Sequence, residues 1–383
     1  MKIAIFTNNY LPNSFGVANS VEAFRKDFEK LGHTVYIFAP HWPGYIDENP
    51  NVFRYPSLDI KFKIRFPLAI PYSWKIRKIL QKLNIDIIHS QHPNLLGSVA
   101  RRWARKKRIP LIFTWHTRYD LYSGYVPFVP PKIAARFMIR KAVKFANRAD
   151  AVIVPTASIA PIIKNWGVKN NNIIPIATGV ETQQLENADG HMIRKKYSIK
   201  DDETVLFVIS RFTAEKNMEF LFRSVIEVLK KNKKVKFMAA ASGYLQPELE
   251  KTVAENGVET QVIFAGHISD DIKKNYFAVS DIFVFASKSE TQGMVISEAM
   301  YMGLPIVAVN APGVNSLVLN KANGFLVSER EDEFARAVEK LISDKELRQR
   351  FSEASRKIAR ENFTSDICAK KMLEVYSSLI SKR

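Results

Sequence analysis

Residues 281–309 read DIFVFASKSETQGMVISEAMYMGLPIVAV. The apolar start predicts a buried strand, and the polar loop after it contains Glu290 and Gly293. A helix is expected to begin near Met294 and to end at Gly303-Leu-Pro305, because a glycine followed by a proline is a typical helix stop. The next apolar run, 306–309, predicts another strand. The segment is therefore typical of a βαβ unit.

The same alternation of short apolar runs and longer amphipathic stretches extends over most of the chain. It indicates parallel sheets covered by helices, once on each side of residue 180. We expect an α/β fold with two Rossmann-like doubly wound domains facing across a cleft, one of residues 1–180 and one of residues 181–363. The strand-like runs are 3–6, 34–38, 85–89, 111–114 and 151–154 in the first half, and 205–209, 236–240, 261–264, 282–285 and 306–309 in the second.

Composition and charge narrow the class of protein. With 46% hydrophobic and 25% charged residues, the 383-residue chain is neither disordered nor collagen-like, and its length favours two domains. Residues 1–180 contain 27 basic and 9 acidic side chains, whereas residues 181–383 contain 30 and 29. Nearly all of the net charge of +19 therefore lies in the first half, which predicts an anionic surface or substrate as its partner.

The lone cysteine and the hydropathy pattern bear on the compartment. Cys368 has no second cysteine to pair with, which favours a reducing environment. No run reaches the roughly 18 apolar residues that a membrane-spanning helix needs. We expect a protein that is soluble, or that lies on a membrane without crossing it.

Polar residues that follow the predicted strands are the first candidates for a site, because ligands of doubly wound sheets bind beyond the carboxyl ends of the strands. In the second half, Arg211 and Lys216 follow one strand and could both donate to a diphosphate. Glu290, in the loop after the run 282–285, and Glu298, on the helix that follows, could accept hydroxyl groups. Gly293 would let a phosphate approach the amides at the helix start. Solvated surface cations and a chance pair of carboxylates remain the alternatives.

The first half offers fewer signals. His116 follows the run 111–114 and is either an acid, base or sugar contact, or a structural histidine. Gly16 permits close approach of a ligand to the backbone, but the loop lacks the full Gly-x-Gly-x-x-Gly pattern of a dinucleotide site. No Asp-x-Asp or His-Glu-x-x-His sequence occurs. We expect neither a cofactor nor a metal.

Three segments contain much of the excess positive charge, and in one of them, residues 98–108, six of the last eight residues are basic. Residues 59–66 alternate apolar and basic side chains, which predicts a half-buried strand with a basic outer face. Basic residues also recur every fourth position on a helix that Pro130-Pro131 would open, and they span about 160° of one face. Apolar neighbours such as Ile133 and Phe137 suit this helix to an anionic membrane, and a solvated face is the alternative. These expected membrane-facing residues are Lys132, Arg136, Arg140, Lys144 and Arg148.

Taken together, these motifs resemble those of the retaining glycosyltransferases of the GT-B fold, family 4. The resemblance spans roughly residues 1–330. It rests on the Gly16 loop, Ile85-Asp86-Ile-Ile-His89, the His116 loop, Ile176-Ala-Thr178-Gly179-Val180-Glu181, Arg211…Glu215-Lys216-Asn217 and Glu290-x7-Glu298. The segments Tyr10-Leu-Pro12, Trp115-His116-Thr-Arg-Tyr-Asp120 and Thr291-Gln-Gly293 most resemble the diacylglycerol glucosyltransferase branch. Ser210 departs from the glycine common in the family, and the usual glycine-rich turn after the run 236–240 reads Ala241-Ser-Gly243-Tyr-Leu-Gln here.

The resemblance implies a role for each matching residue. Glu290 and the amides of Gln292, Gly293 and Met294 would hold the donor sugar, and Glu298 would bind the ribose. Arg211 and Lys216 would bind the diphosphate and stabilise it as it leaves. Gly16 would support the phosphate, and His116 would lie beside the reacting sugar. Tyr10, Tyr119 and Asp120 are expected on the acceptor side, and the C-terminal segment 364–383 is expected to cross back and complete the first domain.

The resulting expectation is a retaining, metal-independent hexosyltransferase. It would move glucose from UDP-glucose to diacylglycerol or a related lipid, as a peripheral protein on the cytoplasmic face of the plasma membrane. The alternatives are GDP-mannose or another UDP-sugar as donor, and phosphatidylinositol, a polyprenyl carrier or a polysaccharide as acceptor. A basic nucleic-acid-binding protein is the remote alternative, because no reading motif accompanies the charge.

Overall fold

Two compact units make up the chain. The computed structural model describes residues 1–13, 16–61, 65–122 and 129–382. Unit 1 consists of Met1–Gly179 together with Ser365–Arg383, and unit 2 consists of Val180–Thr364. These bounds differ by one residue from the ranges expected from the sequence. Each unit is an α/β domain with its own parallel sheet.

The main sheet of unit 1 has seven strands in the order β3-β2-β1-β6-β7-β8-β9. The strand order reverses between β1 and β6, which is where doubly wound sheets bind ligands. All residues of β6, β7 and β8 are buried, as expected for parallel strands with helices on both faces. The strands are β1 (Lys2–Phe6), β2 (Thr34–Pro40), β3 (Val52–Tyr55), β6 (Ile87–Ser90), β7 (Leu111–Thr114), β8 (Ala151–Val154) and β9 (Ile173–Pro175). The helices are α1 (Gly16–Lys30), α2 (Trp74–Lys82), α3 (Leu96–Lys107), α4 (Tyr119–Tyr122), α5 (Pro131–Ala146) and α6 (Ile159–Asn165).

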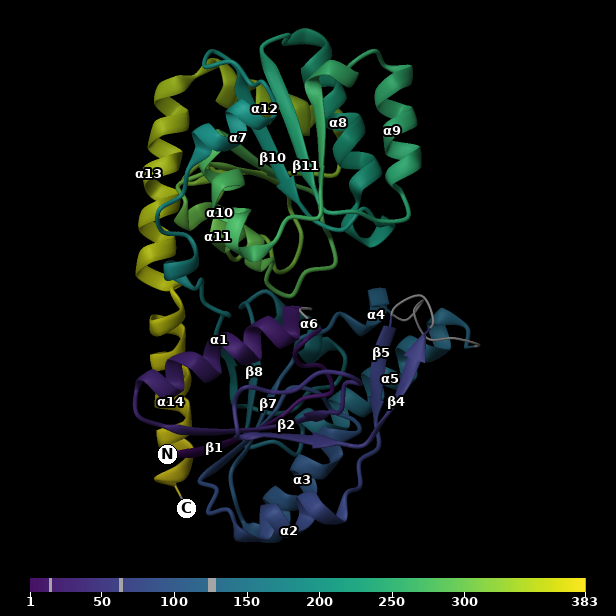
Figure 1. The fold of residues 1–383 in the computed structure, drawn as a ribbon, viewed down its shortest axis with the longest axis vertical. Helices are drawn as coiled ribbons and strands as arrows, with labels where there is room; N and C mark the ends of the chain where they lie inside the picture. The colour runs from purple at the N-terminus through teal and green to yellow at the C-terminus, as the bar shows by residue number, and fades with distance from the viewer. Residues whose placement is uncertain (14–15, 62–64, 123–128, 383) are drawn as a thin grey trace. The chain divides into compact units, whose positions relative to one another are not determined.

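The last helix of the chain, α14 (Ser365–Ile380), belongs to unit 1. It lies beside α1 (Figure 1). Its buried side chains Ala369, Met372 and Tyr376 pack in one core with Ile3 and Phe28. The C-terminal segment therefore completes the first domain.

Unit 2 repeats the architecture with six parallel strands in the order β12-β11-β10-β13-β14-β15. Its strand order reverses between β10 and β13. The strands are β10 (Thr204–Ile209), β11 (Val235–Ala240), β12 (Val262–Gly266), β13 (Ile282–Phe285), β14 (Ile306–Val309) and β15 (Gly324–Val327). The helices are α7 (Gly190–Lys196), α8 (Met218–Lys231), α9 (Gln246–Glu255), α10 (Asp270–Val279), α11 (Met294–Tyr301), α12 (Glu331–Ser343) and α13 (Lys345–Asn362), with short 3₁₀ turns η2 (Thr182–Gln184), η3 (Ala214–Lys216) and η4 (Glu259–Gln261).

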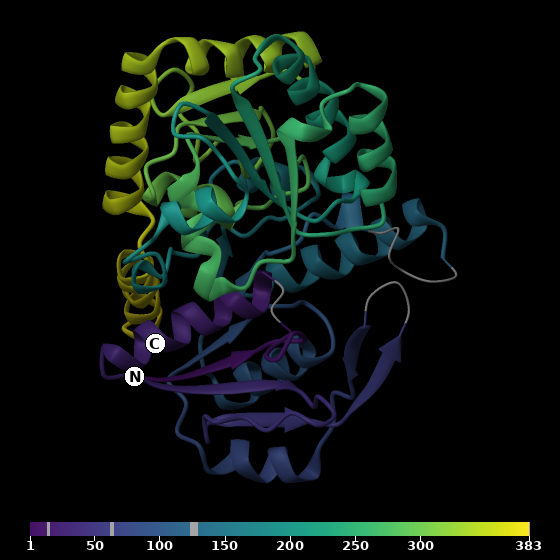
Figure 2. The same ribbon diagram turned by 45° about the horizontal axis from the view of Figure 1, so that its top comes forward.

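The segment around residue 60 differs from its prediction. In place of one strand over residues 59–66 there is an antiparallel hairpin of β4 (Ser57–Lys61) and β5 (Arg65–Ala69), which projects from the body of unit 1 (Figure 2). Phe62, Lys63 and Ile64 lie outside the described residues. The prediction of one strand with its large apolar side chains buried was wrong: Leu58 and Phe66 are exposed, whereas Pro67 and Ala69 are buried.

Candidate functional site

In unit 2, the loops after β10 and β13 bring opposite charges together. Lys216, in the 3₁₀ turn η3 after β10, places its Nζ 2.5 Å from Oε1 of Glu290, which follows β13. Arg211 lies in the same loop as Lys216, and its Nη2 donates to Glu215 at 3.3 Å. Because β10 and β13 are adjacent at the point where the strand order reverses, their carboxyl ends place these side chains at the preferred ligand position of the sheet.

The Glu290 carboxylate is held in its charged form. Ser287 Oγ donates to the same Oε1 at 2.9 Å. Burial alone would raise the pKa of Glu290, but the Lys216 ammonium, the Ser287 hydroxyl and the charge of Arg211 lower it below the usual glutamate range. Glu290 is therefore an ionised hydrogen-bond acceptor beside two cations.

The start of α11 forms the other side of this loop. Gly293 is the N-cap of the helix with a φ of 77°, a left-handed conformation that favours glycine. Met294 is the first helical residue and Gln292 is buried. The first amides of a helix have no partner within it, so this end can bind an anion. Gly313 also has a positive φ, and a Cβ there would lie 2.6 Å from the carbonyl oxygen of Glu290, so a side chain would displace the Glu290 loop.

Glu298 lies on α11 and has a different cation. Its Oε1 accepts a hydrogen bond from Lys273 Nζ of α10 at 2.8 Å. Its Oε2 is buried and has no hydrogen-bond partner among the described residues. Burial raises the pKa of Glu298 despite Lys273, while the carboxylates of Glu298 and Asp270 raise the pKa of Lys273 against its burial. An unpaired buried carboxylate oxygen is costly, and hydroxyl donors on a ligand would satisfy it.

In unit 1, His116 follows β7 and is fixed by a residue that follows β6. The Nε2 of His116 lies 2.6 Å from Oε1 of the buried Gln91. Burial, with smaller contributions from His92 and His89, lowers the pKa of His116 to about 3, so the imidazole is neutral at physiological pH. An amide oxygen only accepts, so the proton of this neutral ring is on Nε2.

A second histidine connects the C-terminal helix to this edge of the sheet. His89 on β6 lies 2.6 Å from both Tyr376 Oη of α14 and Thr114 Oγ1 at the end of β7. Burial lowers the pKa of His89 to about 3 and that of His92 to about 4. His92 Nδ1 accepts the amide of Asn8, which follows β1. The carboxyl ends of β1, β6 and β7 are therefore joined by neutral histidines.

The residues expected on the acceptor side have definite partners. Tyr119 begins α4 and packs edge-on against Trp115, with ring centroids 5.8 Å apart. Asp120 accepts two hydrogen bonds from Arg118, at 2.7 and 3.0 Å. Both residues share the loop of His116. A Cβ on Gly16, the first residue of α1, would meet no atom within 4 Å, so the space beside it is open.

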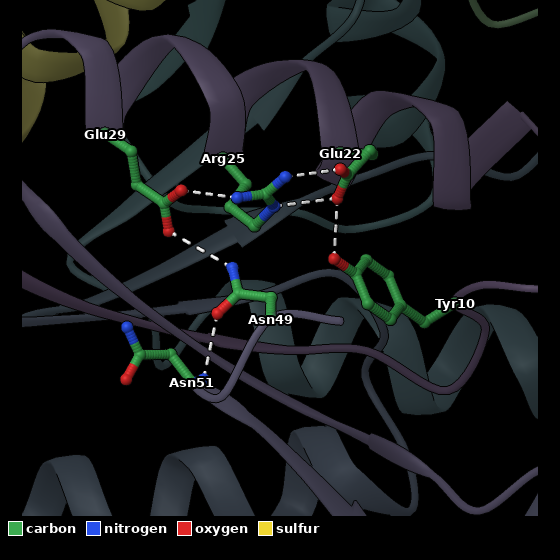
Figure 3. Close-up of polar contacts among 6 residues, drawn as sticks. All are labelled: Tyr10, Glu22, Arg25, Glu29, Asn49 and Asn51. Carbon is green, nitrogen blue, oxygen red and sulfur yellow. Dashed lines mark hydrogen bonds and ion pairs between the residues drawn. The ribbon is translucent and has the colours of Figure 1, made fainter. Parts of the chain in front are cut away.

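Tyr10 belongs to a polar network on α1 (Figure 3). Its buried hydroxyl donates to Glu22 Oε2 at 2.6 Å, and Arg25 donates to both oxygens of Glu22. Burial and Glu22 both raise the pKa of Tyr10. Arg25 also pairs with Glu29. The Tyr10 hydroxyl is thus committed to a contact within the fold.

Four of the five expected membrane-facing cations lie on α5, and all five are exposed. The helix ends at Ala146 with Asn147 as its C-cap, so Arg148 lies beyond the helix on which it was expected. In the part of the chain that the structure describes, no helix is long and apolar enough to cross a bilayer. Within that part, no group of three or more His, Cys, Asp or Glu side chains could hold a metal ion.

Three residues that contact the candidate site residues were not predicted from the sequence. Gln91, Lys273 and Gly313 lie on elements distant in sequence from the residues they contact. Gln91 lies two residues after the predicted strand 85–89, and that position was the signal that could have revealed it. No sequence pattern indicates Lys273, since its relation to Glu298 arises from the packing of α10 and α11.

Comparison with known proteins matches each half of the chain to a glycosyltransferase family. Residues 16–184 match Glycosyltransferase Family 4, and residues 191–358 match Glycosyl transferases group 1. An alpha-monoglucosyldiacylglycerol synthase from Streptococcus pneumoniae is 30% identical over 95% of this chain and 83% of its own length. A protein with the same activity from Acholeplasma laidlawii is 27% identical over 100% and 98%. A GDP-mannose-dependent alpha-mannosyltransferase from Mycobacterium tuberculosis is 24% identical over 93% and 91%.

Among solved structures, Anabaena HepE in complex with UDP and glucose superimposes with a TM-score of 0.77. The match covers 99% of this chain and 100% of that one at 19% identity. At this identity the likeness shows the fold.

Proposed function

The chain belongs to the GT-B glycosyltransferases of group 1 and family 4, and from that premise we propose that it transfers glucose from UDP-glucose to diacylglycerol with retention at the anomeric carbon. The placement of Lys216 against Glu290 where the strand order of unit 2 reverses carries this proposal. It puts a cation for a phosphate and an acceptor for a sugar hydroxyl within one hydrogen bond of each other.

The leaving diphosphate is the centre of the chemistry. When the bond between the sugar C1 and the diphosphate oxygen breaks, negative charge develops on the diphosphate. Arg211 and Lys216 supply positive charge at that point, and fixed charges act strongly in a site that excludes water. An ammonium has three N–H donors, so Lys216 can keep Glu290 and still donate to a phosphate. The proposal needs no metal ion for this step.

The two glutamates would divide the donor between them. Glu290 and the amides near Gly293 would hold the glucose, and the unpaired Oε2 of Glu298 would accept the ribose hydroxyls. The ion pair with Lys273 offsets part of the cost of burying Glu298 before the donor binds.

The lipid acceptor would bind to unit 1. The neutral His116 would orient the sugar or the acceptor hydroxyl, with Tyr119 and Asp120 in the same loop. Gly16 leaves open space for a phosphate oxygen. The exposed cations of α5 would bind anionic lipid headgroups on the cytoplasmic face of the membrane.

Labelled UDP-glucose, with vesicles containing diacylglycerol, tests the function. We expect a labelled glucolipid from the wild type and almost none from Glu290→Ala. Equal rates for the two proteins would refute the assignment. Replacing Lys132, Arg136, Arg140 and Lys144 by Gln should weaken vesicle binding and leave the affinity for UDP unchanged.

A second candidate keeps the reaction and changes the donor. The similarity to the GDP-mannose-dependent enzyme favours GDP-mannose in that role. Thermal shift with UDP-glucose and GDP-mannose distinguishes the two, since a ligand at 100 times its Kd stabilises a protein by about 2.7 kcal/mol.

A further inference from the structure

The β4–β5 hairpin exposes an apolar face. Its register places Leu58 opposite Leu68 and Ile60 opposite Phe66, so the four side chains share one side of the two strands. Leu58 is 55% exposed, Phe66 38% and Leu68 36%.

The other side of the hairpin packs against the core of unit 1. Ala69 is buried in a core that also contains Phe38 of β2 and Tyr55 of β3. The hairpin is therefore attached to unit 1 through its small residues and presents its large apolar residues to the solvent. Contiguous exposed apolar groups mark an interaction surface.

The chain that leaves the hairpin also exposes two aromatic rings. Tyr72 is 63% exposed, and Trp74, the first residue of α2, is 57% exposed. The Arg77 guanidinium and the Lys78 ammonium lie 5.5 and 5.6 Å from the centroid of the Trp74 ring. Tryptophan and tyrosine with adjacent cations favour the boundary between headgroups and acyl chains. We name this surface the hairpin patch: Leu58, Ile60, Phe66, Leu68, Ile70, Tyr72 and Trp74.

Charge identifies the partner. Residues 57–82 contain seven basic side chains and one acidic side chain, Asp59. A partner must therefore match an apolar strip bordered by cations, and an anionic lipid surface offers both acyl chains and negative headgroups. The hairpin and the start of α5 lie on the same side of unit 1 in both views (Figures 1 and 2). Ile133 and Phe137 are also exposed there, among the cations of α5.

We propose that the hairpin patch inserts into the boundary between headgroups and acyl chains of an anionic bilayer. The inference deepens the proposed function, because it names the surface through which the protein would reach a lipid acceptor. Insertion of apolar side chains differs from attraction by α5 alone, since it leaves a part of the binding that salt does not screen.

A single labelled cysteine tests the insertion. The only cysteine, Cys368, is buried, so a dye can be directed to Leu68→Cys. The matched control is Leu319→Cys in unit 2, where the native leucine is 48% exposed. On adding vesicles of phosphatidylcholine and phosphatidylglycerol, we expect the emission of the Leu68 dye to rise and shift to the blue, and that of the Leu319 dye to stay unchanged. Equal responses at both positions would overturn the proposal.

Vesicle binding of a second variant gives an independent measurement. Leu58→Thr/Leu68→Thr introduces β-branched residues that suit strands, so the hairpin is expected to persist. Its partition coefficient should fall about tenfold, because two apolar side chains lose their burial. In wild type, binding should persist in about 0.5 M salt, where charges are screened within a few ångströms. Three results would each refute insertion. They are wild-type affinity of the variant for vesicles, complete release of the wild type by salt, and a blue shift that occurs without vesicles and grows with protein concentration.

These readouts do not depend on the enzymatic assignment. Transfer of glucose to diacylglycerol in detergent micelles tests the proposed function without a bilayer. Insertion without transfer would refute the proposed function alone, whereas transfer in micelles without insertion would refute the hairpin alone.

Discussion

The two sheets reverse their strand order at equivalent positions, but the side chains at these two positions differ in charge. In unit 2, the site consists of ion pairs, Lys216 with Glu290 and Lys273 with Glu298. In unit 1, the corresponding strand ends are occupied by His89, His92 and His116, which burial keeps neutral. The unit with almost no net charge therefore has the charged site, and the unit with most of the charge has the neutral one.

This contrast separates two uses of charge. Paired charges at a strand end can exchange partners with a charged ligand, as a nucleoside diphosphate requires. A neutral imidazole can hold a hydroxyl group by a hydrogen bond without a charge that attracts ions. The excess cations of unit 1 lie on exposed faces such as α5 and not at the buried strand ends.

The largest expected effect is at the charged site. Lys216→Ala should lower kcat by about 10²- to 10³-fold, because it removes a cation from the developing charge on the diphosphate. Steady-state rates with labelled donor measure this. Lys288→Ala is the matched control: its lysine lies in the Glu290 loop but forms an exposed pair with Glu329, which contributes little. A Lys216→Ala rate close to that of the control would remove the charged site from the mechanism.

The next prediction concerns the neutral charge state of His116 in unit 1. Gln91→Glu should raise the pKa of His116, because a carboxylate favours the imidazolium. If that pKa reaches about 7, kcat at pH 6 falls about tenfold relative to pH 8, whereas the wild type shows no acid limb from this histidine. Nitrogen NMR of His116 reports its protonation directly. Gln91→Met removes the acceptor without adding charge, and it should change the tautomer without creating the acid limb.

An unchanged His116 resonance in Gln91→Glu would show that Gln91 does not set the state of the ring. Altered kcat with an unaltered pH profile would assign Gln91 to packing.

How far the sequence predicts this molecule depends on the range of each interaction. All ten apolar runs became strands, because β-branched and aromatic runs between helices need only local patterning. Strands β3, β9 and β15 were missed, because they lie at the edges of their sheets and most of their residues are only partly buried, unlike the fully buried strands of the same length. In the hairpin the alternation was recognised but its buried face was not, because the sequence does not say which side of a strand meets the core.

The candidate site also has features that the sequence predicts and contacts that it does not. The positions of Arg211, Lys216 and Glu290 after strands are local properties of the chain. The contacts that these residues make with other elements are not local properties. The pairing of Glu298 with Lys273 depends on two helices packing side by side, and the bond from His89 to Tyr376 joins residues 287 positions apart. The resemblance of motifs supplied roles, but contacts of this kind required the structure.

A smaller effect is expected at Glu298. Glu298→Gln should weaken UDP binding about tenfold, which corresponds to the loss of one charge-assisted hydrogen bond. Isothermal titration with UDP measures it. In Lys273→Met the pKa of Glu298 should rise further, since its cation is gone, so the affinity for UDP should fall as the pH falls toward that pKa. Wild-type affinity in both variants would leave the buried Oε2 without a ligand role.

The smallest effect is expected for Tyr10, and it tests whether the Tyr10 hydroxyl contacts the acceptor. Tyr10→Phe removes the hydrogen bond to Glu22, but Arg25 still donates to both carboxylate oxygens. The free energy of unfolding should therefore fall by only about 1 kcal/mol, as for one hydrogen bond, with kcat and the KM for the lipid unchanged. Urea unfolding and lipid kinetics measure the two quantities. A raised KM with unaltered stability would instead place the Tyr10 hydroxyl on the acceptor, and the neutral region of unit 1 would then extend from the histidines to α1.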